Sequence, residues 1–234
     1  MENFVSFKDV VKSYYTGGVT VHALDGLGFD VKEGEFVVIV GPSGAGKTTL
    51  LNLLGGMDSP TSGEIIVGGK VLSAFNERQL TEYRRGIVGF VFQFYNLMPN
   101  LTSFENVELA VEICKDHIPP EEVLKSVGLE ERQKNFPSQL SGGEQQRVSI
   151  ARAVAKNPKI ILCDEPTGAL DYETGKKILK LLHDICREKN KIVILVTHNS
   201  ALKEMADKVI MIKNGRIEHV IINENPKSIE EIEW

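Results

Sequence analysis

The chain has 234 residues, 42% of them hydrophobic and 25% charged, and this composition with a formal net charge of -5 suits a soluble globular protein of one large domain or two small lobes. The mildly acidic balance disfavours a general nucleic-acid binder. No apolar run approaches the roughly 18 residues that cross a bilayer, and three widely spaced cysteines match no metal-binding pattern and favour a reducing cytosol.

The N-terminal part of the chain is rich in strand patterns. Residues 4–12 alternate loosely and predict an edge strand, and residues 19–31 predict more strand with a break near Asp25 and Gly26. Residues 36–40 form a short apolar strand, and residues 64–67 predict another strand. We therefore expect a β-rich layer around one strand–loop–helix unit.

The loop of that unit, residues 41–48, reads Gly-Pro-Ser-Gly-Ala-Gly-Lys-Thr and matches the phosphate-binding pattern G-x-x-x-x-G-K-[ST]. An apolar strand precedes it and a helical pattern follows, as the motif requires. Glycines let backbone N–H groups turn toward phosphate oxygens, and the helix N-terminus adds its positive end. Lys47 can bridge the β- and γ-phosphates, and the Thr48 hydroxyl can ligate Mg²⁺.

The middle of the chain changes to helical spacing. Asn76 predicts the N-cap of a short charged helix over residues 76–85, and a strand follows over residues 87–92. Between residues 93 and 157 strand signals are few, Pro120 marks a helix start and Gly128 a helix stop. We expect a helical lobe inserted between strands of the first lobe.

Two continuous apolar runs, residues 160–163 and 192–196, predict strands buried on both faces of a parallel sheet. A helix over residues 173–188 separates them. The dipeptide Asn214-Gly215 predicts a final hairpin, and the tail over residues 223–234 is short and acidic.

Both apolar runs end in polar side chains. In a parallel α/β sheet, the C-terminal strand ends face the ligand crevice. We therefore expect Asp164 to hold Mg²⁺, directly or through water, and Glu165 to act as general base toward the attacking water. His198, at the end of the second run, is expected to contact the γ-phosphate or that water.

Residues 140–147 read Leu-Ser-Gly-Gly-Glu-Gln-Gln-Arg and predict a second anion site. Ser-Gly-Gly before a helix exposes backbone N–H groups at a positive helix end, although alone it would be an ordinary serine cap. One triphosphate does not need two such loops in one chain. A symmetric dimer would use both, with the loop of residues 41–48 in one subunit facing the Ser-Gly-Gly of the other.

In this order, the motifs resemble those of the ATP-binding subunits of ATP-binding cassette (ABC) transporters, over nearly the whole chain. Residues 41–48 resemble the Walker A loop, residues 140–145 the signature, residues 160–165 Walker B and residues 168–171 the D-loop. The resemblance implies an α/β P-loop NTPase cassette with a mostly parallel core sheet, an antiparallel β-subdomain and an inserted helical subdomain. It implies a nucleotide-binding core with the β-subdomain at residues 1–92 and 158–234, and a helical signature subdomain at residues 93–157.

The resemblance also implies the residues of an ATP site. Catalysis would rest on Glu165, His198, Gln93 and Lys47, and Mg²⁺ would be held by Thr48, Gln93 and Asp164. Tyr14 would stack on adenine, with its neighbour Tyr15 as the alternative, and Asp171 would couple two sites across a dimer. The nucleotide-contacting residues implied for the two subunits are Tyr14, Gly41, Ser43, Gly44, Ala45, Gly46, Lys47, Thr48, Thr49, Ser141, Gly142, Gly143, Glu144 and Asp171. Glu144 stands where the family usually has glutamine, a variation that we expect to be tolerated.

The function implied is that of an ATPase whose homodimer closes on ATP and drives a membrane permease from the cytoplasmic face of the cell membrane, with no nucleic-acid partner. Residues 90–97, 105–109 and 164–171 look like those of the lipoprotein-releasing, macrolide-exporting and antimicrobial-peptide-resistance group. That group implies export of a lipoprotein, peptide or drug-like substrate. Cell-division cassettes belong to the same wider group, and the sequence does not separate them.

Two other classes are alternatives. A soluble ABC ATPase of DNA repair or translation would carry a long coiled coil between Walker A and the signature, or two cassettes, whereas here residues 50–140 separate the motifs of a single cassette. A different P-loop enzyme, such as a GTPase, would need a guanine-specifying N-K-x-D, and the sequence has none.

Overall fold

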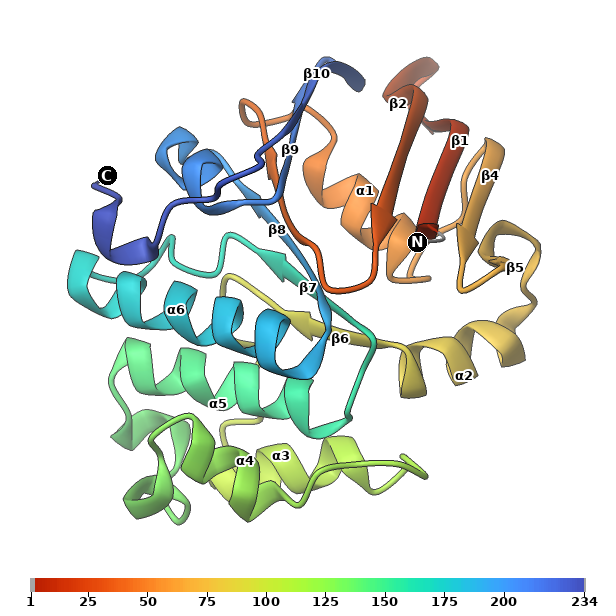
Figure 1. Ribbon diagram of the computed structural model, residues 1–234. Coiled ribbons are helices and arrows are strands. Elements are labelled where there is room, and N and C mark those ends of the chain that lie inside the picture. Colours follow the sequence, from red (N-terminus) through yellow and green to blue (C-terminus); the bar gives the residue numbers. More distant parts are fainter. Residues whose placement is uncertain (1–2, 234) are drawn as a thin grey trace.

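Figure 1 shows the computed structural model of the protein, which describes residues 3–233. Two β-sheets occupy the upper part of this view, and a group of helices lies below them. The predicted domain limits at residues 1 and 234 fall outside the described residues, and the division into subdomains stays a prediction.

The larger sheet has six strands in the order β10-β9-β3-β8-β7-β6. These strands are β3 (Phe36–Val40), β6 (Val88–Val91), β7 (Ile160–Asp164), β8 (Ile192–Thr197), β9 (Lys208–Lys213) and β10 (Arg216–Ile222). β6, β7, β8, β3 and β9 pair in parallel, and β10 pairs antiparallel with β9. Every residue of β3 and β8 is buried, which confirms the strands predicted from continuous apolar runs.

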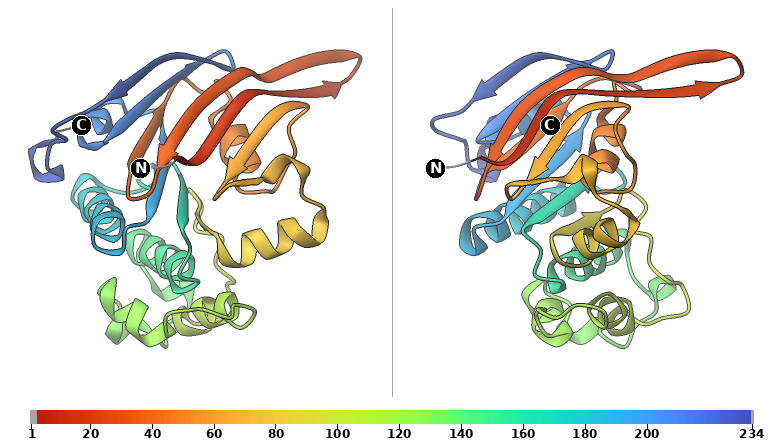
Figure 2. Two further views of the ribbon diagram at one scale, coloured as in Figure 1. Left: turned by 45° about the vertical axis from the view of Figure 1, so that its right-hand side comes forward. Right: turned by 90° about the vertical axis from the view of Figure 1, so that its right-hand side faces the viewer.

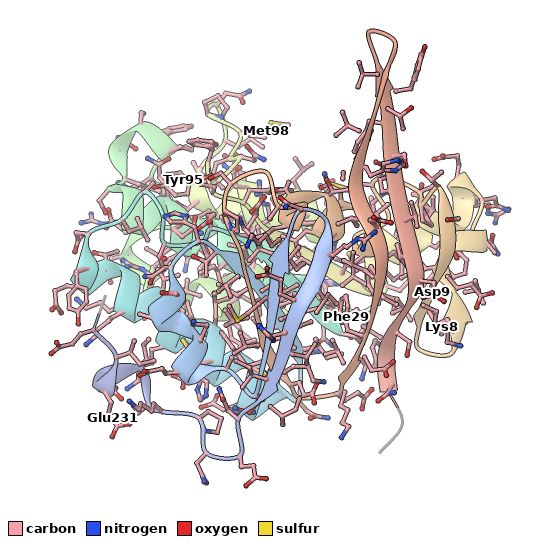
Figure 3. All side chains as sticks on the ribbon, turned by 90° about the horizontal axis from the view of Figure 1, so that it is seen from above. Lys8, Asp9, Phe29, Tyr95, Met98 and Glu231 are labelled. Atoms are coloured by element: carbon pink, nitrogen blue, oxygen red, sulfur yellow. The ribbon has the colours of Figure 1, made fainter. Side chains whose placement is uncertain are left out.

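The smaller sheet is antiparallel, with the order β2-β1-β4-β5. Its strands are β1 (Asn3–Thr16), β2 (Val19–Lys32), β4 (Ser62–Val67) and β5 (Lys70–Val71). Figure 2 shows β1 and β2 extending past the rest of the molecule as a two-stranded ribbon. In Figure 3 the same ribbon projects far beyond the body, with Lys8, Asp9 and Phe29 toward its base.

The prediction of an edge strand over residues 4–12 is wrong, because β1 lies between β2 and β4. The loose alternation has a structural cause: the register between β1 and β2 shifts on either side of Val10. The expected break near Gly26 is one of these shifts. There β2 places an extra residue opposite β1, Gly26 takes a φ of 71°, and the strand continues.

The described part of the chain has six α-helices, beside short 3-10 turns: α1 (Lys47–Leu54), α2 (Glu77–Gly86), α3 (Ser103–Val111), α4 (Pro120–Ser126), α5 (Gly142–Ala155) and α6 (Tyr172–Lys189). The helices α3, α4 and α5 come between β6 and β7 and lie together at the bottom of Figure 1. This is the helical insertion that the sequence predicted.

Local signals in the sequence are confirmed at the ends of several elements. The Asn76 side chain accepts a hydrogen bond from the backbone N–H of Gln79 and caps α2. Pro120 opens α4, as expected. Asn214 and Gly215 both have positive φ, 50° and 74°, which is the geometry of the tight turn joining β9 to β10.

The six-stranded sheet separates two hydrophobic cores. Val38 and Val40 of β3 point into the core formed with α5 and α6, whereas Val37 and Ile39 point into the core formed with α1 and the antiparallel sheet. Alternate residues of a strand face opposite sides, so both faces of β3 must be apolar. Since β3 leads directly into the loop of residues 41–46, the buried sheet fixes where that loop begins.

Candidate functional site

The phosphate-binding loop runs from the end of β3 to the first turn of α1. Gly46, at the N-cap of α1, has a φ of 101°, and a Cβ atom there would lie 2.3 Å from the carbonyl oxygen of Ala23. At Gly41 a Cβ atom would lie 2.1 Å from the carbonyl oxygen of Ile212. Both positions therefore require glycine, and the loop lies tightly against its neighbours.

Lys47 lies across this loop. Its ammonium group donates to the carbonyl oxygens of Gly41 at 2.8 Å and Pro42 at 3.0 Å, and the residue is only 8% exposed. Ser43, Gly44 and Ala45, which are predicted to contact the nucleotide, lie in the chain between Pro42 and Lys47. The loop is also held from outside, because the Gly215 N–H donates to the Ala45 carbonyl oxygen. A cation, a helix N-terminus and a glycine-rich backbone thus meet in one small region, which suits a phosphate group.

Thr48 and Asp164 come together at the same edge of the sheet. The Thr48 hydroxyl donates to Asp164 Oδ2 at 3.1 Å, although 115 residues separate the two along the chain. Burial, together with the nearby charge of Glu165, raises the pKa of the Asp164 carboxyl, while the hydrogen bond from Thr48 opposes the rise. The pair offers hard oxygen donors of the kind that Mg²⁺ prefers.

Glu165 follows Asp164 in a left-handed backbone conformation, with a φ of 45°. Its carboxylate is held by two strand-end residues: Thr197 Oγ1 donates to Oε2 at 2.9 Å, and the His198 N–H donates to Oε1 at 2.8 Å. His198 Nδ1 also lies 2.8 Å from Oε1. The predicted base and the predicted histidine therefore touch each other.

Thr197 was missed by sequence reasoning, although a signal existed. It is the hydroxyl residue at the end of an otherwise aliphatic strand, it is only 2% exposed, and it adjoins His198. Its Oγ1 donates to Glu165 and accepts from the Asn199 N–H.

Gln93 lies near the same sheet edge. Val91 of β6 pairs with Cys163 of β7, so Gln93 and Glu165 each lie two residues beyond paired positions. The Gln93 amide is 3.4 Å from the position that a Cβ atom on Gly168 would take. Sheet register thus brings Gln93 close to the Walker B segment.

The loop after Gln93 is tied to the signature helix. Tyr95 and Asn96 both have positive φ, and Arg152 of α5 donates to their two carbonyl oxygens. In Figure 3, Tyr95 and Met98 lie at the same end of the molecule. Arg152 was not predicted, and no local pattern marks it.

The signature residues Ser141 to Glu144 begin α5. Ser141 caps the helix: its Oγ accepts from the Glu144 N–H, while its own N–H donates to the Glu144 carboxylate at 2.8 Å. Gly142 and Gly143 form the first turn between these two residues. No hydrogen bond or ion pair within residues 3–233 joins this segment to the phosphate-binding loop, and the two helices α1 and α5 pack into opposite cores of the central sheet.

Asp171 caps α6 by accepting from the Thr174 N–H at 3.0 Å, and this backbone hydrogen bond is the main cause that holds the pKa of the Asp171 carboxyl below its usual value. Thr174 in turn packs on the signature, since a Cβ atom on Gly143 would lie 2.3 Å from Thr174 Cγ2. The D-loop and the signature are therefore neighbours within the chain.

Tyr14 and Tyr15 lie near the tip of the ribbon. Tyr14 is 39% exposed and its hydroxyl donates to Asp58 Oδ2, whereas Tyr15 is 77% exposed. Burial and the Asp58 carboxylate raise the pKa of Tyr14, and a hydrogen bond with the side chain of Thr49, in the first turn of α1, opposes the rise. Of the two, Tyr14 is the tyrosine that the structure connects to α1.

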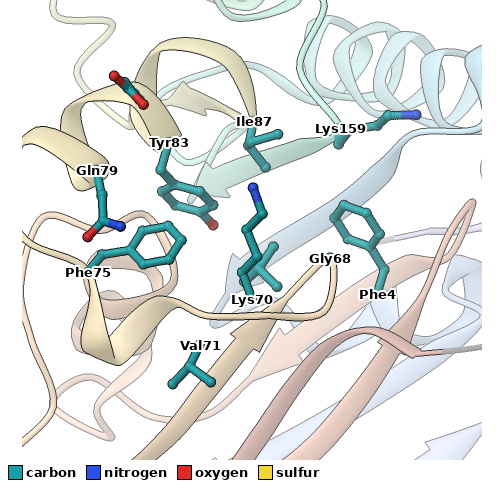
Figure 4. A pocket seen from close by; sticks show the side chains of 11 residues that line it. Phe4, Gly68, Lys70, Val71, Phe75, Gln79, Tyr83, Ile87 and Lys159 are labelled. Atoms are coloured by element: carbon teal, nitrogen blue, oxygen red, sulfur yellow. The ribbon is translucent and has the colours of Figure 1, made fainter.

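Figure 4 shows a groove of about 720 Å³ between α2 and the β4–β5 turn. Phe4, Phe75 and Tyr83 give it an apolar wall, and Lys70 and Lys159 lie along it. None of its lining residues is a predicted site residue. The groove is therefore a separate feature from the phosphate-binding loop.

The ABC transporter family model matches residues 24–168 of this chain. This chain belongs to the ABC transporter ATP-binding family. An ABC transporter ATP-binding protein of Mycoplasma pneumoniae, the MG065 homolog, is 47% identical over the whole chain. The present chain spans 51% of the length of that relative.

Solved ABC structures have the same fold. The cassette MJ0796 of Methanocaldococcus jannaschii, solved as a dimer in a post-hydrolysis state with ADP and Pi, superposes with a TM-score of 0.87 at 42% identity and covers 94% of this chain and 99% of its own. The protein cbiO1 of Clostridium perfringens, part of the transporter complex cbiONQ, gives a TM-score of 0.83 at 28% identity, covering 94% of this chain and 88% of its own.

These comparisons confirm the predicted family and the α/β P-loop cassette fold. They also confirm that the chain is an ABC ATPase domain. The roles predicted for individual residues stay predictions. Over the described residues, no helix has both the length and the hydropathy needed to span a bilayer.

Proposed function

We propose that this chain is the ATP-binding and ATP-hydrolysing subunit of an ABC transporter complex, and that two copies close head to tail on ATP to drive a membrane permease. The observation that carries the proposal is the meeting of three separate segments at one sheet edge. The phosphate-binding loop, Asp164-Glu165 and Thr197-His198 are joined there by hydrogen bonds.

In this proposal each group at the edge has one task. Lys47 binds the β- and γ-phosphates, and Glu165 accepts a proton from the attacking water. His198 holds that water and the γ-phosphate. Thr197 keeps the Glu165 carboxylate oriented through its hydrogen bond.

Mg²⁺ would be held by Thr48, Asp164 and Gln93. The oxygen donors of these residues fit the ion, yet the described residues contain no cluster of three His, Cys, Asp or Glu side chains that could hold a metal alone. Phosphate oxygens of ATP would complete the coordination. When bound, Mg²⁺ would neutralise charge that develops on the phosphates.

The dimer is supported by the separation of the two anion sites. Within residues 3–233, no hydrogen bond or ion pair joins Ser141 to Glu144 with the loop of residues 41–48, so a γ-phosphate at that loop would meet the signature of a second copy. The dimeric state of the MJ0796 cassette supports this arrangement. Asp171, which adjoins the signature through Thr174, would couple the two composite sites.

The partner would be an integral membrane permease, contacted from the cytoplasmic face. The place of cbiO1 in a transporter complex supports such a partner. For the substrate, the motif likeness of residues 90–97 and 164–171 favours the group that exports lipoproteins, peptides or drug-like compounds. Pull-down from membranes that carry the genetically adjacent permease, followed by mass spectrometry, would test this assignment.

The general base is tested by Glu165→Gln. The variant should bind ATP, lose turnover by at least about a thousandfold, and run as an ATP-dependent dimer on size exclusion, because the amide cannot accept the water proton. Glu165→Gln that still hydrolyses ATP at the wild-type rate would remove Glu165 from the mechanism. His219→Gln, on the exposed face of β10, is the matched surface control.

A further inference from the structure

Three side chains form a closed set of contacts on one face of β1, and we name them the Lys12–Tyr14–Asp58 triad. Lys12 Nζ lies 2.6 Å from Asp58 Oδ1, and the Tyr14 hydroxyl donates to Asp58 Oδ2 at 2.8 Å. Lys12 Nζ is also 4.9 Å from the centroid of the Tyr14 ring. Each member of the triad therefore touches the other two.

Strand geometry and one tethered loop build the triad. Lys12 and Tyr14 are two residues apart in β1, so their side chains share a face. Asp58 lies in the loop that follows α1. Three hydrogen bonds hold that loop against β1. Lys12 Nζ donates to the Ser59 carbonyl oxygen. The Thr61 N–H donates to the Val11 carbonyl oxygen, and Thr61 Oγ1 accepts from the Ser13 N–H.

The contacts within the triad shift the pKa values of Asp58 and Tyr14 in opposite directions. Burial would raise the pKa of the Asp58 carboxyl, but hydrogen bonds from Lys12 and Tyr14 outweigh it and hold the pKa below its usual value. Burial and the Asp58 carboxylate both raise the pKa of Tyr14. At neutral pH a carboxylate thus accepts two hydrogen bonds, from an ammonium and from a protonated phenol.

The triad fixes the orientation of an aromatic ring beside the phosphate-binding helix. Lys12 covers one ring face of Tyr14 by a cation–π contact, and Tyr14 remains 39% exposed. Tyr15 points to the other side of the strand and is 77% exposed, so it belongs to no such set. A planar base that stacks on Tyr14 must therefore use the face that Lys12 does not occupy.

We propose that Lys12 and Asp58 are positioning residues for the nucleotide base, which act by holding the Tyr14 ring ready to stack. This inference rests on the proposed ATP site and specifies how the part of that site that holds the nucleobase is built. A ring fixed in advance loses little side-chain entropy on binding, and such entropy is a sizeable cost for each side chain that a ligand immobilises. The triad touches neither the γ-phosphate end of the site nor Glu165, so it should affect nucleotide affinity and leave the chemical step unchanged.

The test compares two probes, ATP and inorganic tripolyphosphate, which carry the same phosphate chain with and without a base. Dissociation constants of both are measured in magnesium buffer for wild type, Asp58→Asn, Lys12→Met, Tyr14→Phe and Tyr14→Ala. Asp58→Asn, Lys12→Met and Tyr14→Phe should weaken ATP by about three- to tenfold, and Tyr14→Ala by about tenfold or more, as expected for lost base stacking. Binding of tripolyphosphate should stay within twofold for all four variants. In Asp58→Asn and Lys12→Met, kcat at saturating ATP should not change.

A double-mutant cycle separates positioning from general structural damage. In the Tyr14→Ala background, Asp58→Asn should have no further effect on ATP affinity, because no ring remains to be held. Tyr15→Ala is the matched aromatic control and should bind ATP as wild type does. Equal weakening of ATP and tripolyphosphate, full additivity with Tyr14→Ala, or an unchanged ATP affinity in Asp58→Asn would each overturn the inference. Failure of the wild type to bind ATP would instead overturn the proposed function.

Discussion

At the scale of single residues, Glu165 is held through its carboxylate by its neighbours on β8 and just beyond it. Its φ of 45° costs energy for a residue with a side chain, yet the carboxylate gains hydrogen bonds from Thr197 and from the His198 backbone. The strained backbone directs the side chain toward β8 rather than into solvent. A positioned base is a general requirement for proton transfer.

Thr197→Val should lower kcat for ATP hydrolysis by about tenfold and leave the KM for ATP within twofold. The change preserves shape in a buried strand but removes a hydrogen bond to a charged group, a contact that contributes about 1.5–3 kcal/mol. Steady-state kinetics would measure both constants. Thr197→Ser, which keeps the hydroxyl, should retain most of the activity, and equal kcat values for valine and wild type would show that Thr197 is only a packing residue.

At the scale of elements, the signature helix depends on its first turn. Ser141 and Glu144 form a reciprocal capping box, and Arg132 Nε donates to the Glu144 carboxylate at 3.0 Å. Glutamate and glutamine both complete such a box. The departure from the family's usual glutamine therefore keeps the cap and adds a negative charge near a positive helix end, where it is stabilising.

That charge predicts a pH dependence of stability. The backbone hydrogen bond from Ser141 is the main cause that lowers the pKa of Glu144 from its ordinary value of 4.5. A carboxyl with a lowered pKa in the folded state contributes stability above the unfolded pKa and loses it as the pH falls through the folded pKa. Glu144→Gln should therefore show a smaller loss of unfolding free energy than wild type below about pH 4.5, by at most about 1 kcal/mol, the usual size of a cap.

Urea unfolding of both proteins between pH 7 and pH 3 would measure the difference. The other carboxyl groups titrate in both proteins, so the difference between the two curves isolates Glu144. Parallel curves over the whole range would contradict a charged cap at α5. Glu112→Gln, at the C-terminal end of α3 away from any capping box, serves as the control for the loss of one surface charge.

At the scale of the whole molecule, the proposed dimer predicts that two inactive variants rescue each other. Ser141→Arg should block the signature and Glu165→Gln the general base, so each homodimer lacks both complete sites. In a mixed dimer, the Ser141→Arg chain supplies an intact Glu165 and the Glu165→Gln chain supplies an intact signature. One complete site is then restored.

Mixing equal amounts should recover up to about one quarter of wild-type ATPase activity. Random assortment makes half of the dimers mixed, each with one complete site of two, and ATP-bound Glu165→Gln homodimers lower this share. Activity is measured against the ratio of the two variants, with the sum of the separate homodimers as the baseline. A mixture no more active than that sum would show that the phosphate-binding loop and the signature do not work across two chains.

The sequence determined the parts of this molecule whose physics is local. The phosphate-binding loop needs glycine where backbone turns or close approach exclude a Cβ atom, and continuous apolar runs specify strands buried on both faces. The caps at Asn76 and Pro120 and the turn at Asn214-Gly215 follow from neighbouring residues alone. These local signals placed most of the strands and helices, and the order of the motifs carried the resemblance that implied the fold class and the candidate site residues.

Tertiary structure decided what depends on residues far apart in the chain. The pairing of β1 on both sides, the hold of Thr197 on Glu165 and the contact of Asp58 with Tyr14 each join segments that no window of sequence brings together. Sheet register and loop tethering set those distances, and both arise only when the two cores pack. The choice of Tyr14 over Tyr15 as the ring connected to α1 is therefore a tertiary result, because two adjacent residues of a strand differ only in the face to which they point.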